Sequence, residues 1–428
     1  MTCSWTIHFN LTDVNTVLRI VKKGTISTDR YSKLLVGPPG GIDLFTIDQS
    51  PVYSDAYTQE PEILINFTSS WGSDWYNQEH EWHLDVSIVN VYWKNLTFFK
   101  HQSIYNQNDC NNFTAYRFNS DRDDQTLELF LTEVTYFNDA MESIFFIYDS
   151  SNFTNFLGRY DSLAPNDTKW FTSTTRTFTV FYAQTGDYKY STELVYRLKE
   201  ENTANCLGTN LVYARPNEVL YKIGSANGQC MFTVLIPYQQ IVTNFGDRLF
   251  GVLNITSLYF KSNSTAKIVY NPIEDNYDNK ILDFNQDTAQ LYSQSIVYGQ
   301  LISILIPGNS ELEIGLKSQE YIPNLYKEFD ERAMGLYMSP HYSDDTINLD
   351  DVPEMNLTLK CTQGMAKFMV TIYYADIKNN SLLTFYADSN IIAEYNGKVH
   401  ANTLFITATT FMIKFNTNST QTTSKSMK

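Results

Sequence analysis

The stretch from Glu142 to Gln184 constrains the fold of this chain more than any other. Ile144–Tyr148 is a compact apolar run, and Phe178–Tyr182 is a second run of aromatic and β-branched residues. Residues of these types suit a pleated, half-buried surface, and the Asp, Ser and Asn residues at 149–152 are typical of a turn. We therefore expect two strands of a β-sandwich.

The same unit recurs along the chain. Each copy has a cysteine close to an alternating strand, and the copies repeat at roughly hundred-residue intervals, the size of a whole domain rather than of a solenoid unit. The matched opening strands of the first three units follow Cys3, Cys110 and Cys230. In the fourth unit the matched strand is Phe368–Ile372, which begins after a short gap behind Cys361. The matched closing strands are Ile63–Ser69, Phe178–Tyr182, Leu312–Ser318 and Phe411–Thr417.

The pattern predicts an all-β chain of tandem antiparallel β-sandwich domains. The expected domains are 1–95, which would lack its N-terminal part, 108–200, 206–321 and a partial or divergent 356–421, with a polar tail at 422–428. One short helix is expected near 323–336, because Leu325, Phe329 and Leu336 have helical spacing.

Charge and hydropathy narrow the classes of partner. The formal net charge is −16 and no basic run occurs, whereas neutralising phosphate requires clustered Lys and Arg. We therefore expect no nucleic-acid partner and read the acidity as an aid to solubility. No apolar segment reaches the roughly 18 to 20 residues that span a bilayer, so no membrane span is expected.

Sequons of the form Asn-x-Ser/Thr are spread over the whole length. They indicate a glycosylated, extracellular surface, although roughly half could arise by chance in a chain rich in Asn, Ser and Thr. No secretion signal is visible at the start, so we expect the chain to lack its true N-terminus. The sequons lie at Asn10, Asn66, Asn95, Asn112, Asn152, Asn166, Asn254, Asn263, Asn356, Asn379 and Asn418.

Short motifs resemble those of the CUB domain family. Cys206 and Cys230, the latter followed by Met-Phe-Thr-Val-Leu-Ile-Pro, resemble the opening of such a domain. Ile144–Asp149 resembles the family's L-x-I-Y-D-G strand and turn, and Leu157–Tyr160 resembles the L-G-x-Y/F that follows. Fainter matches are Trp5 and Ile7 in the first unit, and Leu382–Tyr386 with Asn396-Gly397 in the fourth.

The resemblance covers most of the chain in outline and only short motifs in detail. With few cysteines and many sequons, the chain is most similar to the CUB-like secreted proteins of nematodes. This likeness implies extracellular jelly-roll sandwiches and a recognition or adhesion role, often linked to gut and pathogen-response secretions. It also implies a Cys206–Cys230 disulfide, which would constrain the unfolded chain by about 3 kcal/mol.

The remaining cysteines depart from the family pattern. Cys3, Cys110 and Cys361 have no local partner. Each is either a buried free thiol or half of a bridge between units, and the odd count allows a lost upstream partner for Cys3.

No metal is expected. Many CUB domains hold calcium with a Glu and two Asp, but the aspartate position falls at Ser143 in the second unit and at Ser381 in the fourth. A hydroxyl cannot replace the charge of a carboxylate. His80 and His83 lack the i, i+4 spacing of a helical zinc motif, and on a strand they would face opposite sides.

An aromatic cluster, Trp71, Trp75, Tyr76 and Trp82, lies between two expected strands. These rings either stack on sugars or anchor a protein interface, or they close one end of a sandwich, and we favour the last interpretation. No nucleophile elbow, phosphate loop or dinucleotide motif occurs, and 37–41, Gly-Pro-Pro-Gly-Gly, is read as a tight turn.

These observations predict a secreted, glycosylated, non-catalytic protein that recognises an extracellular protein or glycan through its sandwich loops. The resemblance adds innate defence as the setting. No catalytic residue and no cofactor is expected, and the oligomeric state is left open. The alternative is an extracellular hydrolase whose active site forms between domains and leaves no linear motif.

Overall fold

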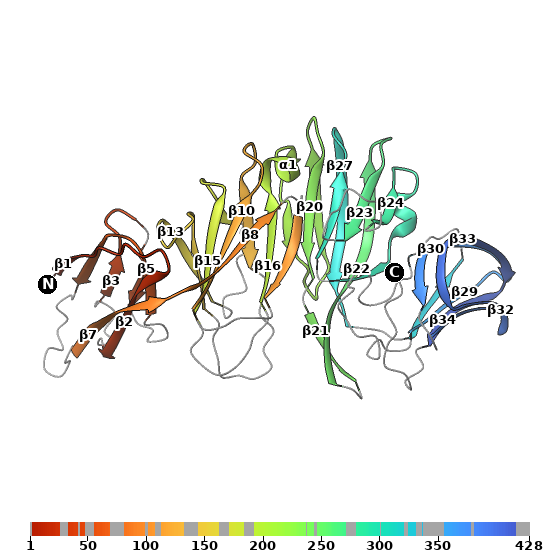
Figure 1. The fold of residues 1–428 in the computed structure, drawn as a ribbon. Helices are drawn as coiled ribbons and strands as arrows, with labels where there is room; N and C mark the ends of the chain where they lie inside the picture. The colour runs from red at the N-terminus through yellow and green to blue at the C-terminus, as the bar shows by residue number, and fades with distance from the viewer. Residues whose placement is uncertain are drawn as a thin grey trace, which may run out of the picture. The chain divides into compact units, whose positions relative to one another are not determined.

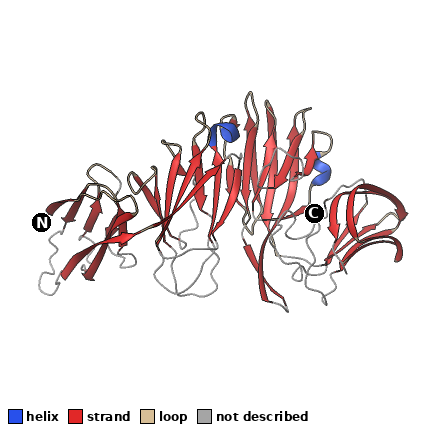
Figure 2. Ribbon diagram, in the orientation of Figure 1, coloured by secondary structure: helices blue, strands red, loops and turns tan. Residues whose placement is uncertain are grey.

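The computed structural model confirms an all-β chain of tandem sandwiches (Figures 1 and 2). The described residues fall into two compact units, Met1–Glu201 and Asn202–Lys428. The structure describes residues 2–25, 33–41, 43–47, 55–68, 81–98, 102–107, 113–131, 144–161, 171–183, 192–236, 238–243, 246–270, 280–299, 301–320, 324–330, 336, 355–377 and 381–416.

The first sandwich pairs a sheet of order β1-β6-β3-β4 with a sheet of order β5-β2-β7. All of its strand pairs are antiparallel. Its strands are β1 (Thr2–His8), β2 (Thr16–Thr25), β3 (Lys33–Gly37), β4 (Phe45–Ile47), β5 (Asp55–Thr58), β6 (Glu62–Thr68) and β7 (Glu81–Asn90).

The second sandwich pairs a sheet of order β13-β12-β15-β10-β8 with one of order β14-β11-β16-β9. Its edge strand β8 runs parallel to β10. Its strands are β8 (Tyr92–Phe98), β9 (Gln102–Gln107), β10 (Thr114–Ser120), β11 (Leu127–Leu131), β12 (Ile144–Tyr148), β13 (Phe156–Asp161), β14 (Phe171–Thr172), β15 (Thr177–Ala183) and β16 (Thr192–Leu198). The short helix α1 (Lys199–Thr203) follows.

The third sandwich pairs a sheet of order β17-β19-β27-β22-β21, with β25 also on β22, with one of order β18-β20-β26-β23-β24. Here β18 is the edge strand, parallel to β20. Its elements are β17 (Cys206–Leu207), β18 (Leu211–Tyr213), β19 (Val219–Ser225), β20 (Cys230–Leu235), β21 (Tyr238–Thr243), β22 (Gly246–Lys261), β23 (Ala266–Tyr270), β24 (Lys280–Phe284), the 3-10 helix η2 (Ala289–Tyr292), β25 (Ser295–Tyr298), β26 (Leu301–Ile306) and β27 (Ser310–Ser318).

The fourth sandwich pairs a sheet of order β28-β29-β34-β31-β32 with the two-stranded sheet β30-β33. The edge strand β28 again runs parallel to its neighbour, β29. Its strands are β28 (Asn324–Phe329), β29 (Met355–Cys361), β30 (Ala366–Ile377), β31 (Leu382–Ala387), β32 (Asn390–Tyr395), β33 (Gly397–Ala408) and β34 (Thr410–Asn416).

One topology runs through all four sandwiches. One position in the sheet is occupied in turn by β1, β10, β20 and β29. The neighbouring position is occupied by their pairing partners β6, β15, β26 and β34. The strands β3, β12, β23 and β31 follow in the same sheet, so the predicted likeness between Ile144–Tyr148 and Leu382–Tyr386 is one of equivalent strands. In the opposite sheets, β7, β16 and β27 are equivalent.

Each sandwich has an apolar core, but the first core is shared. Residues from the second sandwich, including Phe146, Tyr148 and Phe181, pack with Tyr57 of the first. The opposite face of the same sheet, with Ile147 and Val180, packs in the second core. A sheet buried on both faces requires near-continuous apolar strands, which explains the apolar run of β12 and the mostly apolar β15.

The helix predicted near 323–336 is wrong over its described part. Asn324–Phe329 is the strand β28, whose side chains alternate between exposed and half-buried. Leu325 and Phe329 face the same side, because residues four apart coincide on a strand as they do on a helix. Leu336 packs against the core of the third sandwich.

Two of the sequence matches are displaced by one strand. The counterpart of the closing strand in the third unit is β26, whereas the matched Leu312–Ser318 is β27. In the fourth unit the opening strand is β29, which ends at Cys361, and the matched Phe368–Ile372 belongs to β30.

The four-domain plan itself stays a prediction. The strand pairing bears on the domain boundaries. The strand β8 pairs with β10 in the sheet of the second sandwich, and β28 pairs with β29 in the sheet of the fourth. No helix in the described part of the chain combines the length and the apolar character needed to cross a bilayer.

Candidate functional site

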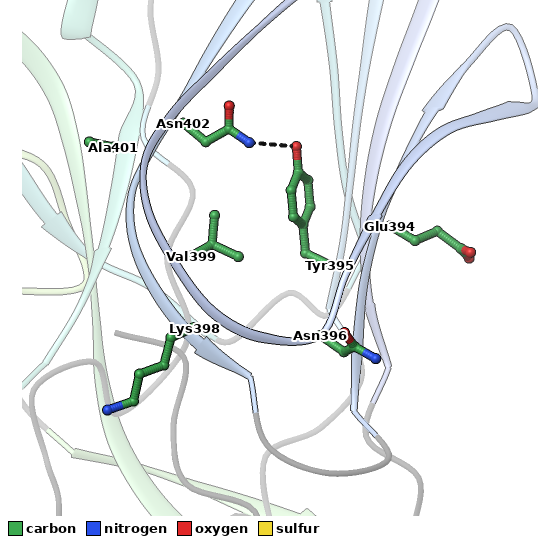
Figure 3. A pocket seen from close by; sticks show the side chains of 7 residues that line it. All are labelled: Glu394, Tyr395, Asn396, Lys398, Val399, Ala401 and Asn402. Atoms are coloured by element: carbon green, nitrogen blue, oxygen red, sulfur yellow. Dashed lines mark hydrogen bonds between the residues drawn. The ribbon is translucent and has the colours of Figure 1, made fainter.

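A pocket of about 580 Å³ lies at one end of the fourth sandwich, where β32 turns into β33. Its volume falls within the range of about 300–1,000 Å³ typical of ligand sites. The pocket is wide open and mainly polar. Its lining residues are Glu394, Tyr395, Asn396, Lys398, Val399, Ala401 and Asn402, all shown in Figure 3.

Tyr395 and Asn402 form the fixed centre of this pocket. The Tyr395 ring packs edge-on against Phe385, with 5.7 Å between the ring centroids. Asn402 Nδ2 donates a hydrogen bond of 2.9 Å to the Tyr395 hydroxyl oxygen (Figure 3). The phenolic O–H and the Asn402 carbonyl oxygen thus remain beside each other as a donor and an acceptor.

The floor of the pocket is apolar and its rim is charged. Val399, on β33, packs with Tyr395 against the core of the fourth sandwich. The side chains of Glu394 and Lys398 point away from the centre in different directions (Figure 3). Their opposite charges leave the rim without a net charge.

A bend in β33 shapes the pocket. Gly397 has φ +77° at the turn from β32, and Ala401 has φ +49° within the strand. Glycine adopts this positive φ without steric cost, and the turn carries the chain from the sheet of β32 to the sheet of β33. Ala401 has no such freedom, and its conformation breaks the regular alternation between Val399 and Asn402.

This arrangement suits the binding of a polyhydroxylated ligand. An apolar floor can receive the C–H face of a ring, and an adjacent donor and acceptor match neighbouring hydroxyl groups, each of which donates and accepts. The pocket places no nucleophile against a base.

The predicted disulfide is confirmed. Cys206 on β17 is bonded to Cys230 on β20, with 4.8 Å between their Cα atoms. Cys3 on β1 is a half-buried free thiol, and Cys361 at the end of β29 is a buried one. Cys110 lies outside the described residues.

The described sequons differ in the accessibility of their side chains, and their glycosylation stays a prediction. At Asn356, Nδ2, the atom that would carry a glycan, donates a 2.6 Å hydrogen bond to Asn324. Asn10, Asn95 and Asn263 are exposed, whereas Asn66, Asn152, Asn254 and Asn356 are half-buried. Asn112, Asn166, Asn379 and Asn418 lie outside the described residues.

Asp149, at the end of the strand matched to the CUB motif, is engaged by protein donors. It is 2% exposed. Ser173 Oγ donates at 2.6 Å, Thr174 donates from N at 2.9 Å and from Oγ1 at 2.6 Å, and Thr175 Oγ1 donates at 3.2 Å. Burial alone would raise the pKa of Asp149, but these hydrogen bonds outweigh it and lower the pKa.

The expected calcium position can be followed only in part. Ser143 lies outside the described residues, and Ser381 is buried just before β31. Both oxygens of Asp149 already accept hydrogen bonds, so this side chain clamps the loop at 173–175. Among the described residues, no cluster of three His, Cys, Asp or Glu is arranged to hold a metal.

The histidine and aromatic motifs are described only in part. His83 lies on β7 with its Nε2 3.4 Å from Asp85, and its side chain is exposed. Trp82 packs against Trp5 and Phe67, at 6.1 and 5.6 Å between ring centroids, and lies half-buried against the core of the first sandwich. His80, Trp71, Trp75 and Tyr76 lie outside the described residues. The Gly-Pro-Pro-Gly-Gly run is a turn closed by Gly41 N donating to Pro38 O.

Sequence reasoning did not identify the pocket. It recognised Asn396-Gly397 but gave no role to Tyr395, Val399 or Asn402. The turn was the only available signal, because the pocket depends on the conformation of Ala401, which no residue pattern encodes.

Comparisons with known proteins give no family. No protein-family model matches this chain. No curated protein is similar to it in sequence. Among solved structures, it is similar to the CUB1-EGF-CUB2 domain of human MASP-1/3, with 9% identity, a TM-score of 0.19, and coverage of 46% of this chain and 92% of the other.

The same domains of rat MASP-1 give 8% identity and a TM-score of 0.22, covering 78% of this chain and 98% of the other. Tripeptidyl peptidase 2 gives 8% identity and a TM-score of 0.15, covering 96% of this chain and 34% of the other. Likenesses this weak carry no argument about function or partners.

Proposed function

We propose that this chain is a secreted, glycosylated, non-catalytic recognition protein that binds a glycan through the β32–β33 end of its fourth sandwich. The observation that carries the proposal is the pairing of Tyr395 and Asn402 above an apolar floor. The proposed recognition role also includes protein ligands that bind at other sandwich loops.

Secretion is supported by the disulfide between Cys206 and Cys230, since such bonds form and persist in oxidising compartments. The exposed sequons at Asn10, Asn95 and Asn263 support glycosylation. A role in innate defence would follow if the bound glycan were microbial.

The ligand class follows from the pocket. Its opposite rim charges, Glu394 and Lys398, favour a neutral ligand over an anion such as nucleic acid. The polar lining disfavours a purely apolar ligand, which would leave the Tyr395 and Asn402 groups desolvated without partners. A neutral saccharide satisfies both conditions.

The test is a glycan array probed with the full chain, followed by titration with the methyl glycoside of the sugar that binds best. Tyr395→Phe keeps the ring on Phe385 and removes one hydroxyl, so affinity should fall about 2- to 12-fold. Asn402→Ala should lower it further. Tyr326→Phe, on the opposite edge strand β28, is the matched control and should change nothing.

Other outcomes decide between a saccharide-binding pocket, a different binding site and a hydrolase. A neutral saccharide requires that Glu394→Gln and Lys398→Gln leave affinity within about twofold. Saccharide binding that is unaffected by Tyr395→Phe and Asn402→Ala would remove this pocket as the site. Hydrolysis of a peptide or glycoside panel, lost on a single carboxylate substitution, would instead establish an extracellular hydrolase.

A further inference from the structure

The sequence contains two Asn-Gly pairs, and the structure surrounds them differently. Asn396-Gly397 is the turn of the pocket between β32 and β33, and Asn227-Gly228 lies in the turn between β19 and β20. In such a pair the backbone nitrogen of the glycine can attack the side-chain carbonyl carbon of the asparagine, because glycine has no side chain to hinder the approach. Asparagine is for this reason a chemically labile residue.

The peptide between Asn396 and Gly397 is open. Both residues are exposed. A Cβ placed on Gly397 would meet no atom of the described residues within 4 Å, its own chain neighbours aside. Gly397 also forms the last pair of the β30–β33 ladder, with Ile377. The turn therefore has room for the side chain of Asn396 to bend back onto the main chain.

The peptide between Asn227 and Gly228 is enclosed. A Cβ placed on Gly308 would lie 3.0 Å from Gly228 N, so the backbone of Gly308 covers the nitrogen that would attack. A Cβ placed on Gly228 would collide with the side-chain nitrogen of Asn205. The main chain of Asn205 also accepts a hydrogen bond of 2.8 Å from Ala226 N. Asn227 therefore has no room to close a ring without movement of its neighbours.

The disulfide fixes this second turn further. Cys206 follows Asn205 directly, and Cys230 lies two residues after Gly228, so the bond between the cysteines ties the turn to the segment that covers it. Ring closure here requires local opening, which carries a free-energy cost in a packed, cross-linked segment. Asn227 and Asn396 are both exposed, so the packing around their peptides separates them and solvent accessibility does not.

We propose that Asn396 is a site of spontaneous conversion to aspartate and isoaspartate, and that the fold protects Asn227 from the same reaction. The nitrogen of Gly397 bonds to Cγ of Asn396, the bond from Cγ to the amide nitrogen breaks, and ammonia leaves with the proton of the Gly397 N–H. Water then adds to either carbonyl carbon of the five-membered imide. Cleavage of the N–Cγ bond gives aspartate, and cleavage of the bond to the main-chain carbonyl carbon gives isoaspartate.

The conversion weakens the saccharide pocket, a consequence that rests on the function proposed above. Isoaspartate inserts a methylene into the main chain directly after Tyr395, at the turn that carries the chain from one sheet to the other. The end of β32 then shifts against β33, and the 2.9 Å hydrogen bond from Asn402 Nδ2 to the Tyr395 hydroxyl oxygen is lost. The added charge alone matters little to a neutral ligand, so the change in the main chain carries the effect.

The test follows the mass of the two peptides that contain these pairs. The full chain is incubated in neutral buffer, sampled over days and digested, and each peptide is weighed for the exchange of an amide NH2 for OH. In the folded chain Asn396 should convert at least about tenfold faster than Asn227. In urea with a reductant the two should convert at similar rates. The rate at Asn396 should rise with pH, because the attacking nitrogen must lose its proton.

Two matched variants control for the chemistry. Asn396→Gln keeps the side-chain amide but would need a six-membered ring to close, so conversion at this position should be lost. Asn227→Gln, at the other exposed turn, should leave conversion of Asn396 unchanged. An isoaspartyl methyltransferase should label the peptide that contains residue 396 in the aged wild type and not in aged Asn396→Gln.

Saccharide titration separates this inference from the proposed function. Aged wild type should bind the sugar about 2- to 12-fold more weakly than fresh protein, and aged Asn396→Gln should not. Asn396→Asp adds the charge without the methylene and should stay within about twofold. A chain that converts at Asn396 but binds no saccharide contradicts the proposed function and supports the modification site.

Two results would overturn the inference itself. Conversion of Asn396 that is no faster than that of Asn227 in the folded chain would remove the modification site. Full conversion to isoaspartate with unchanged saccharide affinity would remove its effect on the pocket.

Discussion

The junction between the first and second sandwiches is aromatic, whereas the described contacts between the third and fourth come from β28 and the start of β29. In the first unit, Tyr57 lies 4.7 Å from Phe181 and 5.0 Å from Phe146 between ring centroids. The Tyr148 hydroxyl also donates to Tyr57 O at 2.6 Å. Buried aromatic pairs of this kind add stability beyond the area they bury.

In the second unit the contacts that the described residues make are partly polar. Leu325 packs against both cores and Met355 belongs to the third core. Lys327 Nζ donates to Gln294 O in the third sandwich. We infer that the first pair of sandwiches unfolds as one body, and that the second pair opens separately at β28.

The largest effect is expected at the aromatic junction. Phe181→Ala should cost about 3–5 kcal/mol, because it leaves a cavity in a fully buried cluster. All six tryptophans lie in residues 1–201, so tryptophan fluorescence during urea unfolding reports on this unit alone. Tyr92→Ala, at an exposed position, should stay within about 0.5 kcal/mol. Equal costs for the two variants would contradict the shared core.

The loop at 173–175 depends on the side chain of Asp149. Its carboxylate accepts from Ser173 Oγ and from Thr174 Oγ1, both at 2.6 Å, while its backbone carbonyl oxygen accepts from Asn155 Nδ2 at 3.3 Å. Asp149→Asn should cost about 2–4 kcal/mol at pH 7, since it leaves buried donors without a carboxylate. Asp124→Asn is the exposed control.

The Asp149 effect should also depend on pH. Because the pKa of Asp149 is lowered on folding, its contribution is complete above the usual aspartate pKa of about 3.9 and is lost as the pH falls through the folded value. The difference in unfolding free energy between wild type and Asp149→Asn should therefore shrink in acid. A difference that stays constant from pH 7 to pH 2 would contradict this account.

A smaller effect is expected at the second junction. Leu325→Ala should cost about 1–2 kcal/mol, because the side chain is only half-buried. Hydrogen exchange should show β28 opening more readily while the tryptophan transition of the first unit is unchanged. Tyr326→Phe, on the opposite face of the strand, should leave both unchanged. A loss in the first unit would show that the two units do not unfold independently.

The smallest effect is expected for Lys327→Met, within about 1 kcal/mol of wild type. Burial lowers the pKa of Lys327, so the unfolded chain holds this proton more tightly and wild-type stability rises with pH between the folded value and about 10.4. Any advantage of Lys327→Met at pH 7 should therefore decline toward pH 10 in hydrogen exchange on β28. An advantage that grows with pH would be the wrong sign.

The β-sandwich class could be predicted from the sequence because strands and turns are encoded by local residue patterns. Phe178, Val180 and Tyr182 alternate with Thr179, Phe181 and Ala183, and β15 lies where this run predicts a strand. The sequence did not predict that both faces of this sheet are covered, because no local pattern says which sandwich supplies the second cover. That depended on Tyr57, more than a hundred residues upstream.

Other features were beyond the reach of residue patterns. Leu325 and Phe329 fit a helix and a strand equally, and only the parallel pairing with β29 decides between them. The pocket depends on a positive φ at Ala401, a residue type with no preference for it. The disulfide was predictable through the resemblance to CUB domains, because spacing alone does not select a partner.

The shared first core affects synthesis on the ribosome. Phe181 emerges long after β7 is complete, and translation at about 5–20 residues per second makes that delay on the order of ten seconds. During this interval Tyr57 and its neighbours lack the rings that cover them. We therefore expect chaperones to bind the nascent first sandwich until the second has been made.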